Sequence, residues 1–182
     1  MLDAETIMLA TEDVLRRYGP AKATVVDVAR ALGVSHAAVY RHFPSKAALR
    51  EAVTRRWLHR AYDDLAAIAA DTGRDPAGRL RDWIFALFAA KRTAAANDPE
   101  LFATYGALAR EHNAVAAEHV EALLGQLEQI VGDPGTARTV FTATAAFHHP
   151  AHAAEWNDPG REALLADLCA VLVAGLPPRP PA

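Results

Sequence analysis

Apolar residues along this chain recur at steps of three and four, which is the spacing of one face of an α-helix. The two-residue alternation of a β-strand is not sustained anywhere. From Ile7 to Tyr18 the spacing predicts an amphipathic helix over residues 3–18, which the Gly19-Pro20 pair ends. Alanine, the best helix former, is the most frequent residue. The pattern therefore predicts an all-α protein.

Later helix starts are marked by Asp followed by Pro, because Asp caps a helix N-terminus and Pro suits the first helical position. Four such pairs predict helices over residues 76–96, 99–131, 135–156 and 160–175. We expect the second of these helices to break near Gly106. The proline-rich residues 177–182 are predicted to form a disordered tail.

Composition narrows the class of protein further. In a chain of 182 residues, 52% hydrophobic and 23% charged residues are ordinary values for a globular protein. A single cysteine, Cys169, excludes an intramolecular disulfide framework and a Cys-rich zinc module. With no run of 18 apolar residues and no secretory signal, we expect no membrane span and a cytoplasmic location.

Motifs of the common enzyme classes are missing from the sequence. Ser35 and Ser45 are the only serines, and neither lies in the G-x-S-x-G motif of α/β-hydrolases. The sequence contains neither a Gly-Lys dipeptide nor a G-x-G-x-x-G motif, which excludes the usual phosphate-binding loops. We therefore expect that the protein is not an enzyme and uses no cofactor.

Charge is distributed unevenly along the chain. Residues 1–60 carry ten Lys and Arg against six Asp and Glu, whereas residues 61–182 carry nine against sixteen. The net charge of −3 thus combines a basic N-terminal part with an acidic remainder. This asymmetry favours an anionic partner for the N-terminal part alone, although chance scatter of charges would also produce it.

The most specific pattern lies at residues 24–43, which read TVVDVARALGVSHAAVYRHF. Thr24 followed by Asp27 resembles a capping box that starts a short helix, and Gly33 ends it in a position suited to a left-handed backbone. Ser35 then caps a second helix, which Pro44 ends near Phe43. Two short helices around a tight turn predict a helix-turn-helix, whose second helix enters the major groove of DNA.

The outward face of the second helix carries the side chains suited to DNA. The side chains that point away from the apolar face are those of His36, Ala37, Tyr40 and Arg41. A small residue such as Ala37 allows close approach to base edges. Tyr40 and His42 can donate hydrogen bonds to phosphates. Lys46 and Thr24 lie at helix N-termini, where the helix dipole favours an anion.

These residues resemble the TetR family of transcriptional repressors. The resemblance covers about residues 5–57 and is strongest in the stretch GVSHAAVYRHFPSKAAL from Gly33 to Leu49. It implies an all-α homodimer, in which a three-helix DNA-binding head is joined to a helical ligand-binding and dimerisation body. Carried over residue by residue, it implies that DNA is contacted by Thr24, Ser35, His36, Ala37, Tyr40, His42 and Lys46.

We expect three parts: a helix-turn-helix DNA-binding domain over 1–46, a regulatory and dimerisation domain over 47–176, and the tail. The apolar stripe of residues 160–175 is wider than one neighbouring helix needs, which favours burial against a second subunit. A fully buried helix in a monomer is the alternative. Cys169 lies within this stripe and is expected to be an inert buried thiol.

Aromatic and apolar residues from three predicted helices could line a cavity for an apolar small molecule. The candidate ligand-binding residues are Trp83, Leu87, Phe102, Tyr105, Phe141, His148 and His152. Ordinary core packing is the alternative reading for any one of the aromatic residues.

Three histidines of the predicted body suggest a more specific hypothesis about ligand or metal binding. His148 and His152 are four residues apart, the helical spacing of two metal ligands, but Pro150 lies between them and predicts a kink. With His112 opposite, they could orient a ligand or bind a divalent metal, or they could be surface residues.

The sequence therefore predicts a ligand-responsive regulator that is released from a palindromic DNA operator by a small-molecule inducer. Two alternatives stay open at this point: a non-specific nucleoid-type DNA-binding protein, and a metal-responsive regulator that uses the body histidines.

Overall fold

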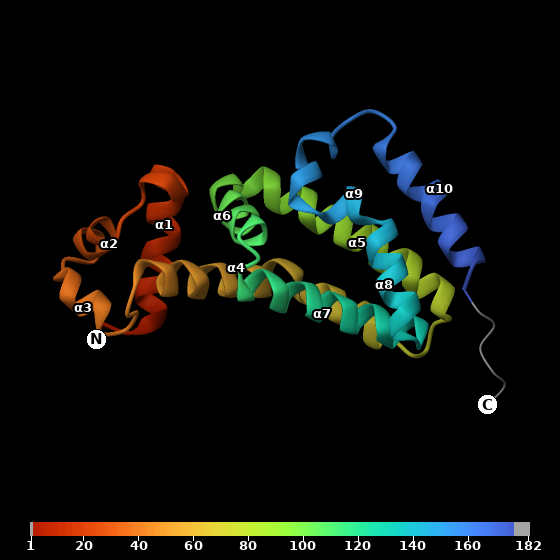
Figure 1. Ribbon diagram of the computed structural model, residues 1–182, viewed down its shortest axis with the longest axis horizontal. Helices are drawn as coiled ribbons and strands as arrows, with labels where there is room; N and C mark the ends of the chain where they lie inside the picture. The colour runs from red at the N-terminus through yellow and green to blue at the C-terminus, as the bar shows by residue number, and fades with distance from the viewer. Residues whose placement is uncertain (1, 177–182) are drawn as a thin grey trace. The chain divides into compact units, whose positions relative to one another are not determined.

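The computed structural model describes residues 2–176, so the predicted tail over 177–182 lies outside the described residues. Within the described range the regular structure is helical, as predicted, and contains no strand (Figure 1). The elements are α1 (Ala4–Lys22), α2 (Val25–Leu32), α3 (His36–Tyr40), α4 (Lys46–Ala70), α5 (Pro76–Asn97), α6 (Pro99–Arg110), α7 (Ala114–Val131), α8 (Pro134–Ala143), α9 (Ala145–His148), the 3-10 helix η1 (Pro150–Glu155) and α10 (Arg161–Ala174).

The chain divides into two compact units. The first unit contains residues 2–61 and 94–117, and the second contains residues 62–93 and 118–176. Three helices, α4, α5 and α7, therefore contribute residues to both units.

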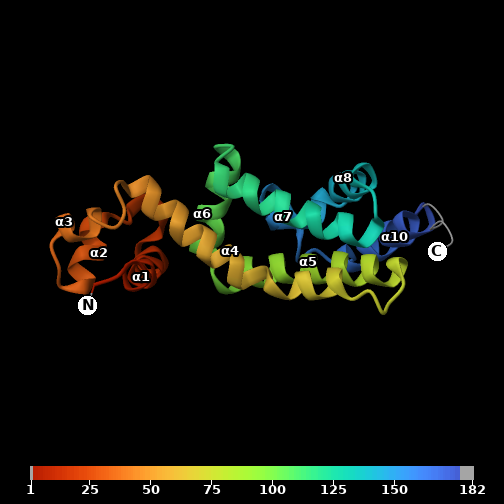
Figure 2. The same ribbon diagram turned by 90° about the horizontal axis from the view of Figure 1, so that it is seen from below.

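In the first unit α1, α2 and α3 gather around the beginning of α4 (Figure 2). Asp3 caps α1 by accepting a hydrogen bond from the Thr6 amide, and the helical backbone is interrupted at Gly19, where φ is 74°. The predicted end at Gly19-Pro20 is thus correct for the backbone dihedrals, although one further turn continues to Lys22. The buried side chains that hold the helices together are Ile7, Val14, Leu15, Val25, Val28, Ala29, Val39, Leu49, Val53 and Trp57.

Helix α6 is attached to α1 and α4 by charged and polar contacts at both of its ends. At its start, Asp98 accepts a hydrogen bond of 2.7 Å from Arg16 Nε and one of 3.3 Å from Trp57 Nε1. After its end, Glu111 pairs with Arg50 at 2.6 Å. Trp57 also meets the ring of Phe102 edge-on, with 6.4 Å between ring centroids.

In the second unit, the largest buried side chain of α5 is Trp83, whose indole donates a hydrogen bond of 2.9 Å to Gln126 of α7. The chain after α8 is fixed by two donors to one carbonyl. Trp156 Nε1 and Arg161 donate to the Ala146 oxygen at 3.0 and 2.8 Å. The buried face of α10 consists of Leu165 and Cys169.

Several predicted helix boundaries are wrong. The segment 99–131 does not break near Gly106, which is buried inside α6, but at residues 111–113, where His112 has a φ of +52°. Asn113 starts α7 there by accepting a hydrogen bond from the Val115 amide. The segment 135–156 divides into three short helices, with breaks at Thr144 and at His149. The second break is due to Pro150, which cannot continue α9. The last helix starts at Arg161 after a left-handed Gly160, one residue later than predicted.

Candidate nucleic-acid interface

The first helix of the helix-turn-helix begins at a complete capping box. Thr24 Oγ1 accepts a hydrogen bond of 3.2 Å from the Asp27 amide, and Asp27 accepts one of 3.1 Å from the Thr24 amide. The side-chain hydrogen bond from Thr24 lowers the pKa of Asp27, with further help from Arg30, so this carboxylate is ionised and α2 is fixed at its start. Both members of the predicted box are confirmed.

Gly33 forms the turn with a left-handed backbone, φ 66° and ψ 29°, as predicted. The amide of Val34 donates a hydrogen bond of 3.0 Å to the Ala29 carbonyl, so the last carbonyls of α2 are satisfied. A Cβ placed on Gly33 would meet no heavy atom within 4 Å. Glycine is therefore needed here for its backbone conformation and not for space.

Ser35 begins α3 by accepting a hydrogen bond of 3.2 Å from the Ala38 amide. Ala38 and Val39 point inward and are 7% and 0% exposed. His36, Ala37 and Tyr40 are exposed, and the rings of His36 and Tyr40 meet edge-on with their centroids 6.3 Å apart. The helix ends at Tyr40, earlier than the predicted Phe43, and His42 follows in an exposed turn.

The next helix, α4, starts at Lys46 and is capped by Ser45, which accepts a hydrogen bond of 3.0 Å from the Ala48 amide. Lys46 is exposed at this N-terminus. All seven residues predicted to meet DNA are exposed and belong to the first unit: Thr24, Ser35, His36, Ala37, Tyr40, His42 and Lys46. Three helix starts and the outer face of α3 thus offer amide, imidazole, phenol and ammonium donors for a polyanion.

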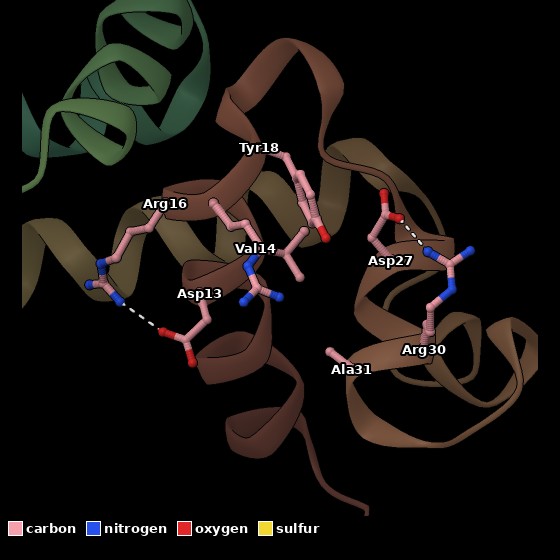
Figure 3. Close-up of a pocket in the computed structure, with 8 residues that line it drawn as sticks. Asp13, Val14, Arg16, Tyr18, Asp27, Arg30 and Ala31 are labelled. Atoms are coloured by element: carbon pink, nitrogen blue, oxygen red, sulfur yellow. Dashed lines mark hydrogen bonds and ion pairs between the residues drawn. The ribbon is translucent and has the colours of Figure 1, made fainter.

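The first unit also contains a polar groove between α1 and α2, which the sequence reasoning missed (Figure 3). Its volume is about 760 Å³, and it is lined by Asp13, Val14, Arg16, Arg17, Tyr18, Asp27, Arg30 and Ala31. Ion pairs from Arg16 to Asp13 at 3.2 Å and from Arg30 to Asp27 at 3.0 Å neutralise part of its charge. No motif marks this groove, since its residues, apart from the buried Val14, are ordinary helix positions that are at least partly exposed.

The candidate ligand-binding residues fall in both units. Phe102 and Tyr105 are buried in the first unit, with their ring centroids 6.2 Å apart. Trp83 and Leu87 are buried in the second unit, where Phe141 is half-buried. Each of these side chains packs within its own unit, so their role in ligand binding stays a prediction.

The three histidines do not form the expected helix face. His148 ends α9 and His152 lies in η1, because Pro150 separates them. His148 Nε2 is 2.9 Å from the Phe141 carbonyl, and burial lowers the pKa of His148 to about 4. His152 contacts Glu155 at 3.3 Å, and His112 is exposed. Across residues 2–176, no three His, Cys, Asp or Glu side chains are grouped so that they could hold a metal ion.

No helix in the described part of the chain is long and apolar enough to cross a bilayer.

Comparisons with known proteins agree with this geometry. The family described as "Bacterial regulatory proteins, tetR family" matches residues 7–53, and "Tetracyclin repressor-like, C-terminal domain" matches residues 76–169. The probable HTH-type transcriptional regulator ArpR of Pseudomonas putida is 35% identical over 83 residues, which are 45% of this chain and 39% of ArpR. The match therefore spans about two fifths of that relative's length.

Solved structures share the fold along nearly the whole chain. FadR of Bacillus subtilis, in complex with stearoyl-CoA, has a TM-score of 0.66 at 14% identity, and 96% of this chain and 100% of FadR are covered. BioQ with its double-stranded DNA operator has a TM-score of 0.56 at 24% identity, with 96% and 99% covered. Since the C-terminal family match alone includes more than half of the chain, the chain belongs to the TetR family of transcriptional regulators.

Proposed function

We propose that this regulator is a sequence-specific repressor, which binds a palindromic operator as a homodimer and leaves it when a small molecule binds. The observation that carries the proposal is the two-sided α3. Val39 anchors the helix with no exposed surface, while His36, Ala37 and Tyr40 remain free of the core. Recognition of DNA bases requires a helix that is fixed in position and has an exposed polar face. A side chain that is mobile before binding loses entropy when the complex forms, which weakens binding.

We propose that residues 1–46 form the DNA-binding domain and that residues 47–176 form the regulatory and dimerisation domain. The seven exposed residues of the DNA-binding domain are proposed to have two different roles. His36 and Ala37 are proposed to read base edges, and Thr24, Ser35, Tyr40, His42 and Lys46 to contact phosphates and fix the register. Operator-bound BioQ, which has the same fold, supports a DNA partner. Binding to chromosomal DNA would place the protein in the cytoplasm.

A dimer follows from the discrimination that one short helix can supply. Each correct base contact is worth about 1–3 kcal/mol, so two heads related by a two-fold axis double the discrimination and require an inverted repeat. Helix α10 supports this assembly. Leu165 and Cys169 are buried on one face, while Leu164 and Val171 are 53% and 70% exposed on others. A second copy of the chain would remove these side chains from water.

Release by a small molecule needs only that the ligand prefers the dimer conformation in which the two heads no longer fit adjacent half-sites. The buried aromatic residues are proposed as candidate ligand contacts, each within its own unit, and FadR with stearoyl-CoA is a protein of the same fold that holds a ligand. We place no metal ion in this mechanism.

Selection of bound fragments from a random DNA pool tests the proposal. The full-length protein should enrich one inverted repeat, and its affinity for that repeat should exceed its affinity for random DNA by at least about a thousandfold at physiological salt. A small-molecule screen for release from the selected site then tests the response. Equal affinity for every sequence, falling with salt, would refute the repressor and indicate a nucleoid-type protein.

A further inference from the structure

The groove between α1 and α2 contains two side chains that the rest of the described chain leaves without polar partners (Figure 3). Arg17 is exposed and forms no ion pair or hydrogen bond with any described residue. The same holds for the hydroxyl group of Tyr18, whose side chain is 45% exposed. Arginine and tyrosine are enriched at the centres of protein–protein contacts, so their exposure side by side favours a protein partner for this surface.

Asp13 lies one helical turn before Arg17 on the same face of α1, and it is 78% exposed. Its contact of 3.2 Å with Arg16 adds little, because Arg16 is already paired with Asp98 at 2.7 Å and with the buried Glu12. The carboxylate of Asp13 is therefore available to a second cation.

This face of α1 is complementary to itself. When two copies of a helix lie antiparallel across a two-fold axis, the numbers of the residues that face each other add up to a constant. One such arrangement places Asp13 of each copy against Arg17 of the other, so that two ion pairs form together. Beside this row, Leu9 is 44% exposed, and Val14 and the ring of Tyr18 supply apolar surface in the groove.

We propose that this groove is the contact between the first units of two neighbouring copies on DNA, each from a different dimer, and that the contact makes their binding cooperative. The proposal rests on the proposed function above, since the two copies must occupy adjacent sites on one duplex. Helix α10, the proposed dimer face, belongs to the second unit, so the two contacts use different residues. A weak contact is sufficient, because a shared duplex raises the effective concentration of each copy for the other.

Other occupants fit the groove less well. Asp13 and Asp27 line it and would repel the phosphates of a nucleic acid. A small ligand normally buries about 70–90% of its surface in its pocket. Here the rim is open to water, since four of the lining side chains are 41–78% exposed: Asp13, Arg16, Tyr18 and Arg30. A mixture of acidic and basic side chains on an open surface matches a protein surface with the same mixture, which a second copy provides.

The test uses the full-length protein and duplexes that carry one or two copies of the selected inverted repeat. The distance between the two repeats is increased one base pair at a time over about two helical turns, because the phase of the helix decides whether neighbouring copies meet. Occupancy is measured by gel mobility shift. At one phase, which recurs after about 10.5 base pairs, the second dimer should bind on the order of tenfold more tightly than the first.

Charge reversal then identifies the contact. Arg17→Asp and Asp13→Arg each place like charges opposite each other, so either change should reduce the cooperativity factor to about one. The double variant Asp13→Arg/Arg17→Asp restores both ion pairs with exchanged partners and should regain cooperativity. Arg110→Asp is the matched control, because Arg110 is another exposed arginine of the first unit without an ion pair among the described residues, and it should keep the factor unchanged.

Independent filling at every spacing overturns the proposal, and so does cooperativity that survives Arg17→Asp. A folded double variant that stays non-cooperative also overturns it. Circular dichroism checks the fold of each variant. Should a reversed charge unfold the protein, Arg17→Gln and Asp13→Asn keep the shape of the side chain and should still lower the factor; an unchanged factor refutes the contact.

These outcomes are separate from those of the operator selection. If no inverted repeat is enriched, the same variants are compared on a long duplex of random sequence, where neighbouring copies still meet. Cooperative filling that depends on Arg17 would then keep the contact and refute the repressor. Independent filling of two enriched repeats at every spacing would keep the repressor and refute the contact.

Discussion

Replacing Glu12 by Gln should destabilise the protein more than any other single isosteric change in α1. The Glu12 carboxylate is 2% exposed and contacts three guanidinium groups: Arg16 Nη2 at 3.2 Å, Arg60 Nη2 at 2.8 Å, and Arg56. The variant keeps the shape and one acceptor but removes the charge that these arginines share. Since Arg16 and Arg60 are 41% and 46% exposed, water compensates for part of the loss.

The magnitude follows from these exposures. Removing one partner of a fully buried pair costs about 3–5 kcal/mol, and an exposed pair is worth about 0–1 kcal/mol. With one buried partner and three partly exposed partners, we expect a loss of about 2 kcal/mol in the free energy of unfolding. For a chain of this size that loss lowers the melting temperature by about 4–8 °C.

Urea denaturation followed by circular dichroism, with a calorimetric melt, measures this loss. Asp13→Asn is the matched control, because Asp13 pairs with the same Arg16 at 3.2 Å but is 78% exposed. The control should change stability by no more than about 0.5 kcal/mol. Equal effects of the two variants would show that the buried carboxylate contributes no more than a surface ion pair, which would refute the reasoning.

Three further predictions concern other parts of the chain. Lys46→Ala should weaken binding to operator and random DNA by similar factors. It should also reduce the slope of log affinity against log salt concentration by about 0.9, measured by fluorescence anisotropy. An unchanged slope would contradict phosphate contact at the start of α4. Gly33→Ala should cost about 1–2 kcal/mol from backbone strain alone, because φ is 66° and no atom blocks a Cβ, and Gly33→Asn should cost less in the same urea assay. In the folded protein the pKa values of His119 and His148 are lowered from 6.5 to about 2 and about 4. As the pH falls, these histidines therefore become protonated in the unfolded chain before they do so in the folded protein. Their neutral forms stabilise the fold above pH 6.5, and stability should decline below it by up to about 1.4 kcal/mol per pH unit for each histidine, a decline that His148→Gln should lessen.

Local signals explain why the helix-turn-helix could be predicted from the sequence. Thr24, Gly33 and Ser35 each act through a hydrogen bond or a backbone angle within a few residues, so the residue type alone determines the local structure. The break between α6 and α7 is also local, but the prediction placed it at Gly106 because glycine is a poor helix former. The residue that marks the break is Asn113, because asparagine is a preferred N-cap residue and here caps the start of α7.

Burial against distant helices could not be predicted in the same way. Lys91 fits the apolar spacing of α5, yet a lysine at such a position normally reaches solvent. Only the packing of Tyr62 and His119 on either side shows that it does not. The spacing of His148 and His152 likewise predicted one shared face, and the actual arrangement depends on how Pro150 redirects the chain.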